Sequence, residues 1–288
     1  MNFDVGGPQL TLMTNAVYKA AVTIRGREKL PDVLFHYTNA EGLHGILGSK
    51  TLWATGFKFL NDQSEYNYGN LFVQDLLLNR SDEFAKRLAK AWPKTGAGWA
   101  DVIPHYVAST CDTGDLIGQW RGYSSLNDGC AVAFRRLALE SRQTKESRLH
   151  VIPIFYSPDQ QRRLVVERVL NVAFEVFASA ERRTKSKVLD HAIFALHRAI
   201  LLLKHPSFAG EREWRLILFD VSGSSENFRV VQGQIVPYLN IPLAPDDIDH
   251  IIQGPGLYRL ASTDTISRFA LKCGFRGIAV KRSHVPLG

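Results

Sequence analysis

The segment Glu211-Arg212-Glu213-Trp214-Arg215-Leu216-Ile217-Leu218 combines two carboxylates with the beginning of an apolar run. Residues two apart on a β-strand project from the same face, so an extended backbone here would point Glu211 and Glu213 the same way. Like charges on one face of a core strand are unfavourable unless something offsets them. Arg212 and Arg215 are the structural candidates for that role, and a ligand beside the strand is the functional one.

Short apolar runs near both ends of the chain predict strands, and the region between them is largely helical. The expected strands cover residues 33–37, 51–54, 106–110, 130–134, 149–156, 214–219, 234–239, 250–253 and 277–280. Helices are expected over 13–22, 40–47, 64–78, 82–92 and 262–273, with 112–128 irregular. Asn39 is the expected N-cap of the helix over 40–47, Gly48 its stop, and Ser81-Asp82 the cap of the helix over 82–92. This arrangement indicates an α+β fold.

The helical pattern is strongest over residues 159–204. Apolar residues recur there at three- and four-residue spacing, which is typical of one buried helix face. They are Leu164, Val165, Val169, Val172, Ala173 and Val176, then Leu189, Ile193, Leu196, Ile200 and Leu203. Because the pattern breaks near 183–185, we expect a helical hairpin inserted into a single domain, 1–288, with 1–32 as a weakly patterned lead-in.

The composition is that of an ordinary globular protein with a basic excess. The 288 residues are 45% hydrophobic and 22% charged, with a formal net charge of +7 and a pI of about 9.3. This charge permits an anionic partner such as nucleic acid, but it is also common as a solubility trait. The three cysteines have no disulfide-like or zinc-like spacing, so we expect no metal and a cytoplasmic setting. We expect neither a signal peptide nor a membrane span.

The segment His36-Tyr37-Thr38 ends the first expected strand and leads into a capped helix. Strand alternation places His36 and Thr38 on one face and Tyr37 on the other. Backbone donors and side chains often converge on a ligand where a strand runs into a helix. His36 is therefore a candidate ligand-binding residue, and a structural histidine is the alternative.

The segment 61–65 holds a second group of candidates, Asn61, Asp62 and Glu65. In the structural interpretation, Asp62 or Ser64 caps the following helix and Glu65 interacts with its dipole. In the functional interpretation, Asp62 and Glu65 project into the same cleft as His36.

The segment 119–123 holds a third group, in which Trp120, Arg121 and Tyr123 are close in sequence. Such residues suit stacking on a planar base and pairing with a phosphate. The alternative is a core tryptophan beside a surface arginine.

Phrases along nearly the whole chain resemble a bacterial domain family of unknown function that is found near phage-defence genes. They are His36-Tyr37-Thr38, Leu60-Asn61-Asp62 with Glu65, Gln119-Trp120-Arg121-Gly122-Tyr123, His205-Pro206 with Phe208, Glu211 with Glu213-Trp214-Arg215, and Gly254-Pro255. This resemblance implies a toxin or an anti-phage effector.

The first of these phrases and the glutamate phrase also resemble ADP-ribosyltransferases of the His-Tyr-Glu group. That resemblance implies an ADP-ribosyltransferase-like split sheet with NAD as cofactor, and a nucleic acid or protein as acceptor. It implies that Glu213 is catalytic, that Glu211 orients or deprotonates the acceptor, and that His36 contacts the adenine-side ribose. The expected NAD-binding residues are His36, Tyr37, Thr38, Asn61, Asp62, Glu65, Trp120, Arg121 and Tyr123.

The residues are consistent with the chemistry that this resemblance implies. Breaking the bond between nicotinamide and ribose passes through an oxocarbenium-like transition state, which one well-placed carboxylate stabilises without a metal. The aromatic residue that would stack on nicotinamide stays open among Tyr66, Tyr68, Trp120 and Tyr123.

Two other classes of function stay open. One is a metal-dependent nuclease or phosphodiesterase, whose ligands would be His36, Asp62, Glu65, Glu211 and Glu213. The other is a non-catalytic module that binds a nucleotide or nucleic acid. The transferase class itself divides into transfer to an acceptor and simple hydrolysis of NAD.

Overall fold

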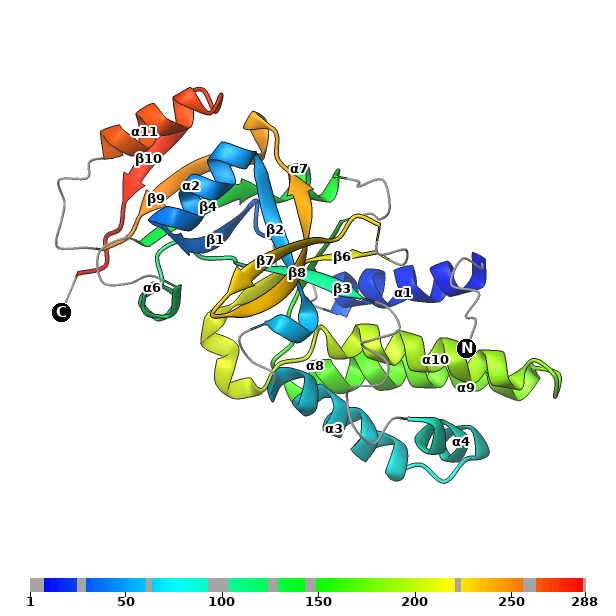
Figure 1. Ribbon diagram of the computed structural model, residues 1–288. Coiled ribbons are helices and arrows are strands. Elements are labelled where there is room, and N and C mark those ends of the chain that lie inside the picture. The colour runs from blue at the N-terminus through cyan, green and yellow to red at the C-terminus, as the bar shows by residue number, and fades with distance from the viewer. Residues whose placement is uncertain are drawn as a thin grey trace. The chain divides into compact units, whose positions relative to one another are not determined.

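The computed structural model describes residues 8–24, 30–60, 64–92, 104–123, 129–142, 149–220, 224–255 and 263–286. These residues form an α+β structure, as the sequence predicts, and the chain divides into two compact units (Figure 1). The helical unit comprises Met1–Glu28, Lys58–Pro104 and Ile152–Ala209, and the sheet unit comprises Lys29–Phe57, His105–Val151 and Gly210–Gly288. None of the described helices combines the length and the hydropathy that a membrane span requires.

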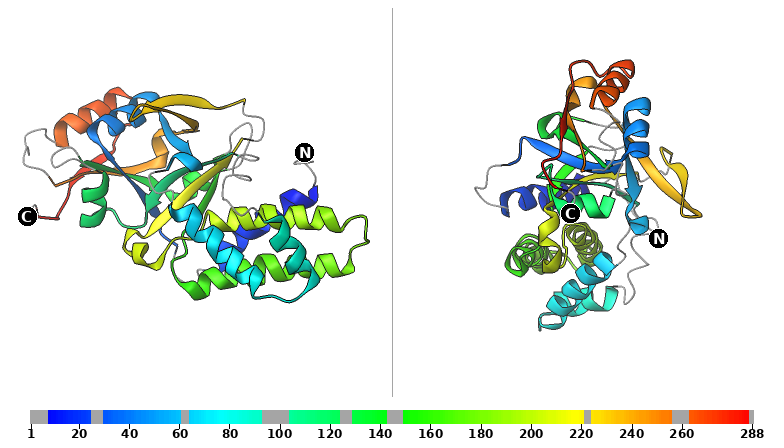
Figure 2. Two further views of the ribbon diagram at one scale, coloured as in Figure 1. Left: turned by 60° about the horizontal axis from the view of Figure 1, so that its bottom comes forward. Right: turned by 90° about the vertical axis from the view of Figure 1, so that its left-hand side faces the viewer.

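The helical unit is built around α10 (Lys185–Ile200), which contacts α1, α3, α4 and α9. Figures 1 and 2 show α9 and α10 side by side from each direction. The other elements of this unit are α1 (Pro8–Ile24), α3 (Ser64–Leu78), α4 (Glu83–Ala91), α8 (Pro158–Arg162), the π-helix η2 (Arg163–Leu170) and α9 (Asn171–Ser179). Residues 159–204 thus contain α8, η2, α9 and α10, and they belong to a helical unit that also includes α1.

The packing of α10 follows from its sequence. Ile193, Leu196 and Ile200 recur at helical spacing and are all buried, which confirms the predicted apolar face. Gly69 on α3 lies opposite Ile200, and a Cβ atom at Gly69 would be 2.7 Å from Cγ2 of Ile200. Glycine at this position therefore permits the close approach of α3 to α10.

The sheet unit contains one mostly antiparallel sheet. Neighbouring strands follow the order β10-β9-β4-β1-β3-β2-β8-β7, and β6 pairs with both β3 and β5. Among the registers of the described residues, the pairing of β9 with β10 is the parallel one. The strands are β1 (Val33–Asn39), β2 (Thr51–Gly56), β3 (His105–Cys111), β4 (Gly129–Arg135), β5 (His150–Pro153), β6 (Glu213–Phe219), β7 (Asn227–Val231), β8 (Gln234–Pro242), β9 (Ile248–Gln253) and β10 (Ala279–Arg282).

One face of this sheet carries the main apolar core. Leu34, Leu52, Phe134, Trp214 and Leu216 belong to it, and each is at most 2% exposed. The remaining helices connect or cover the strands; they are α2 (Ala40–Ser49), α6 (Ile117–Tyr123), α7 (Arg136–Glu140), α11 (Thr263–Lys272) and the 3₁₀ turn η4 (Pro245–Asp247). Two more 3₁₀ turns, η1 (Phe57–Phe59) and η3 (Pro206–Glu211), lie where the chain passes from one unit to the other.

The sheet opens locally beside β3, as the paired residues show. Strand β6 pairs with β3 along its whole length, from His105 to Cys111. The other edge of β3 pairs with β2 only at Tyr106 and Val107, and with β1 only at Cys111. Ser109 lies between these two contacts, so β1 and β2 diverge from β3 on either side of it. We call this opening the split.

Several element boundaries differ from the sequence predictions. The region 112–128, expected to be irregular, contains α6, and neither α7 nor β7 is predicted. The predicted N-cap of α2 is confirmed, because the Asn39 side chain accepts a hydrogen bond of 2.8 Å from the backbone N–H of Gly42. The helix then continues past Gly48 to Ser49, and Lys50 ends it in a left-handed conformation (φ 54°). The N-cap of α4 is Asp82, also as predicted.

The cap at Asn39 gives a direct test of this local structure. Replacing Asn39 by Ala removes the acceptor for the Gly42 N–H and should lower the free energy of unfolding by about 1 kcal/mol. Asn39→Asp keeps an acceptor and should be close to wild type. Chemical denaturation of the three proteins checks this, and an alanine variant as stable as wild type would contradict the assigned cap.

Candidate functional site

Glu213 begins β6 and is buried, with 5% of its surface exposed. Its Oε1 accepts hydrogen bonds from Nε of Arg215 at 2.9 Å and from Oγ of Ser109 at 2.7 Å. Its Oε2 accepts a third bond from Nη2 of Arg215 at 3.1 Å. Arg215 is itself only 1% exposed, so the two charges form a buried ion pair within the sheet. Arg215 is thus a partner of Glu213, but the structural interpretation of a solvated strand entrance is wrong, because the pair is buried.

Glu211 does not belong to the strand. It ends η3, and Arg212 between the two glutamates has a left-handed backbone (φ 50°). This conformation interrupts the alternation of an extended strand, so the expectation that Glu211 and Glu213 share a strand face is wrong. Arg212 is held in place by Asp112, whose Oδ1 lies 2.5 Å from Nε of Arg212 and whose N–H donates to its carbonyl oxygen at 3.3 Å.

His36 lies on β1 at the split and is partly buried. Its Nδ1 is 2.9 Å from the carbonyl oxygen of Ser109, which can only accept, so Nδ1 carries the proton. Nε2 of the neutral ring is then an acceptor. Burial lowers the pKa of His36 below its ordinary value, the bond to Ser109 opposes this, and the positive charge of Arg229 lowers it further. The ring is therefore neutral at neutral pH.

Ser109 brings the two principal predicted residues together. His36 donates to its backbone carbonyl and Glu213 accepts from its side-chain hydroxyl. Only the bond from His36 forms at the split, because Glu213 lies on β6, which pairs with the other edge of β3. Phe35 pairs with Cys111 and Cys111 with Glu213, so strand alternation places His36 on the other face of the sheet, and the two candidates share only their bonding partner, the partly exposed Ser109.

The two residues after His36 have structural contacts. Tyr37 is 5% exposed; its hydroxyl donates to the carbonyl oxygen of Thr113 at 2.8 Å and accepts from the N–H of Leu116 at 3.0 Å. Thr38 is partly buried and lies against the first turn of α2, where Gly42 leaves room for its Oγ1. Tyr37 therefore fixes the segment that leads to α6.

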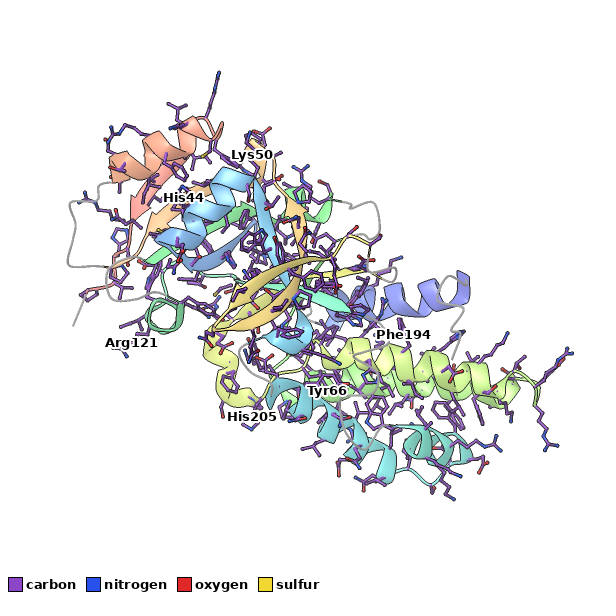
Figure 3. The ribbon with its side chains drawn as sticks, in the orientation of Figure 1. His44, Lys50, Tyr66, Arg121, Phe194 and His205 are labelled. Atoms are coloured by element: carbon purple, nitrogen blue, oxygen red, sulfur yellow. The ribbon has the colours of Figure 1, made fainter. Side chains whose placement is uncertain are left out.

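The aromatic segment on α6 divides into a core residue and two surface residues. Trp120 is 3% exposed, packs edge-on against Tyr37 with ring centroids 4.7 Å apart, and donates from Nε1 to Asp115 at 2.8 Å. Arg121 and Tyr123 are exposed, and Figure 3 shows Arg121 on the outer side of α6. The contacts of Trp120 match the structural interpretation of this segment, a core tryptophan beside a surface arginine.

Glu65, Tyr66 and Tyr68 belong to the helical unit. Asn61 and Asp62 are outside the described residues. Glu65 is buried and forms an ion pair with Lys204, with Oε1 and Nζ 2.6 Å apart. Tyr66 donates toward or accepts from Nδ1 of His197 at 2.9 Å (Figure 3), and Tyr68 donates to Gln161 at 2.7 Å. Within this unit, Glu65 is thus neutralised by a lysine that the sequence predictions do not include.

The described residues contain no group of three or more histidines, cysteines, aspartates or glutamates that could hold a metal ion. Asp62, one of the ligands in the nuclease alternative, is outside that set. Cys111 and Cys130 are buried thiols and Cys273 is a partly buried thiol.

Two residues near the split escape the sequence predictions. Ser109 lies in an apolar strand, and its neighbours in the sequence give no sign of a functional role. Its contacts are revealed only by the pairing of β3 with β1 and β6. Arg229 lies on β7, which is not predicted, so the sequence does not indicate which side chains surround its charge. A signal for Arg229 exists only in the alternation Asn227-Phe228-Arg229-Val230-Val231.

Comparisons with known proteins give one finding. Residues 119–216, about a third of the chain, match the family model described as protein of unknown function (DUF2971). The match begins at Gln119 on α6 and ends at Leu216 on β6, so it includes Trp120 and Glu213 but not His36 or Ser109. No curated protein and no solved structure matches the chain. The segment from α6 to β6 thus resembles this family.

The buried ion pair makes Glu213 a structural residue as well as a candidate catalyst. Glu213→Gln removes the carboxylate from this buried ion pair, and should lower the free energy of unfolding by about 3 kcal/mol. Glu140→Gln is the matched control, because Glu140 pairs with Arg136 but is 35% exposed in its side chain. Its loss should stay below about 1 kcal/mol. Equal losses for the two variants in urea denaturation would contradict the burial of the Glu213–Arg215 pair.

Proposed function

We propose that the sheet unit binds NAD at the split and breaks its nicotinamide–ribose bond, transferring ADP-ribose to a protein, a nucleic acid or water. The observation that carries this proposal is the junction at Ser109. It joins a neutral first-strand histidine to a buried glutamate at the start of β6. These are the two residues that the resemblance to His-Tyr-Glu transferases assigns to ribose binding and catalysis.

In this proposal, Glu213 offsets the positive charge that develops on the ribose. The C1′–N bond breaks with its electron pair leaving on nicotinamide, which departs as a neutral molecule. A hydroxyl of the acceptor or of water then forms the new bond at C1′ and releases a proton. A carboxylate held by Arg215 and Ser109 is preorganised for the oxocarbenium-like transition state, because it needs little reorganisation.

The roles of the other residues follow from their positions. Nε2 of His36 is an acceptor suited to a ribose hydroxyl, since Nδ1 is already committed to Ser109. We assign to Glu211, which lies outside the strand ladder, the role of orienting the acceptor or taking its proton. A toxin or anti-phage role for such an enzyme rests on the family resemblance of the sequence.

Nicotinamide release from NAD tests the catalytic role of Glu213. The assay compares wild type, Glu213→Gln and Glu140→Gln below the melting temperature of all three, in the presence of cell extract as a source of acceptors. Removing one charge-stabilising group should slow release per folded molecule about a hundred- to a thousand-fold, whereas the Glu140 variant should match wild type. Undiminished release by Glu213→Gln, or none by wild type, would refute the proposal.

Treatment with EDTA should leave release intact, whereas a metal-dependent nuclease would lose its activity.

His36→Asn separates ligand binding from folding at the split. The Asn amide can still donate to Ser109 in place of Nδ1, but it has no atom at the position of Nε2. We expect a melting temperature close to that of wild type and a KM for NAD raised about tenfold, the loss of roughly one hydrogen bond. A lower melting temperature with an unchanged KM would indicate a purely structural histidine.

A further inference from the structure

Arg229 on β7 has unusual surroundings for a surface-strand arginine. Its guanidinium carbon lies 5.0 Å from the ring centroid of Trp53 and 5.8 Å from that of Tyr238. Its Nη2 donates to Oγ1 of Thr55 at 2.8 Å. The two aromatic rings are themselves in contact, with centroids 4.7 Å apart. The guanidinium is therefore held against the rings of Trp53 and Tyr238 and does not extend into solvent. We call this pair of rings the aromatic seat.

This cation has no counter-charge among the described residues. The structure gives Arg229 hydrogen bonding to Thr55 alone, and its Nε is buried with no hydrogen-bond partner. Burial lowers the pKa of Arg229, and the electrostatic interaction with Tyr238 opposes this by raising it. A partly buried charge without an acidic partner is unfavourable, since desolvation is not offset by an ion pair. Such a group gains stability when an anion binds it.

Strand register places this arginine on the face of the sheet that carries Glu213. Residues paired across an antiparallel ladder share a face, and so do residues two apart along a strand. The chain of paired and alternate residues runs through Arg229, Asn227, Tyr238, Thr55, Val107, Ser109, Cys111 and Glu213. The charge of Arg229 is also felt by His36. Arg229, Ser109 and Glu213 thus lie on the same face of the sheet.

We propose that Arg229, packed against the rings of Trp53 and Tyr238, binds the diphosphate group of a nucleotide. This inference names a binding residue for the function proposed above, and it rests on that function for the identification of the nucleotide as NAD. A guanidinium suits phosphate because its remaining N–H groups donate charge-assisted hydrogen bonds. Arg215 lies on the same face but is paired with Glu213. One uncompensated charge fits a single diphosphate better than a nucleic-acid backbone, which needs several cations.

Calorimetric titration with ADP, and with adenosine as the ligand that lacks phosphate, tests this site without requiring any reaction. Wild type should bind ADP more tightly than adenosine. Arg229→Gln should bind ADP about ten- to a hundredfold more weakly and adenosine as before, because a charged hydrogen-bond donor is lost. Arg229→Lys keeps the charge and should fall between the two. Arg135→Gln is the control, since Arg135 is paired with Asp249 at 2.9 Å and should bind ADP like wild type.

The outcomes decide the proposal independently of catalysis. Loss of ADP affinity in Arg229→Gln, with a melting temperature within a few degrees of wild type, supports the site even if the protein releases no nicotinamide from NAD. Equal ADP affinity in wild type and Arg229→Gln overturns it, and so does equal affinity of wild type for ADP and adenosine. If Arg229→Gln fails to fold, Arg229→Lys and a loss of ADP affinity on raising the salt concentration carry the test. A salt-independent affinity would then overturn the proposal.

Discussion

The ion pair between Glu213 and Arg215 constrains the sheet unit more than any other single interaction of its site. Both side chains are nearly sealed from solvent, and each charge would be costly without the other. The pair lies on β6, which is fully paired with β3, so the position of the carboxylate is fixed by the backbone ladder. Ser109 then joins the pair from β3. The polar centre is consequently as rigid as the strands that carry it.

That rigidity explains how an otherwise apolar sheet accommodates a buried carboxylate. At Ser109, neither β1 nor β2 pairs with β3. The carbonyl oxygen of Ser109 therefore lacks a partner from the strand ladder, and it accepts a hydrogen bond from His36. An unsatisfied carbonyl in this position would be unfavourable, so the opening and the histidine depend on each other. A ligand at the split would meet side chains whose orientation is already determined.

Much of the fold is predictable because it depends on local patterns. The cap at Asn39, the limits of α3 and the buried face of α10 follow from side-chain chemistry within one or two turns. The relation between Glu211 and Glu213 is not local in this sense. It depends on the left-handed backbone of Arg212, an uncommon conformation for a non-glycine residue that contacts with Asp112 maintain. Strand β7 escapes prediction because its alternation extends over only five residues, most of which are exposed.

The candidate site shows the same division. Phrases in the sequence single out His36 and Glu213, but the residue that links them comes from a strand seventy positions away from one and a hundred from the other. The sequence also treats Tyr37, Trp120 and Glu65 as candidate ligand residues, and their contacts are those of packing and ion pairing. Aromatic and charged residues near a site look alike in sequence whether they build its walls or face its ligand.

The kink at Arg212 has an evolutionary consequence. Because Glu211 lies outside the ladder and Glu213 inside it, the two neighbouring acids are under different mutational pressure. A change at Glu211 alters a turn at the edge of the sheet unit, whereas a change at Glu213 disturbs a buried charge network. Descendants of this chain are therefore free to diversify the outer acid while the inner one is retained. Changes at the outer acid then leave the framework of the sheet unit intact.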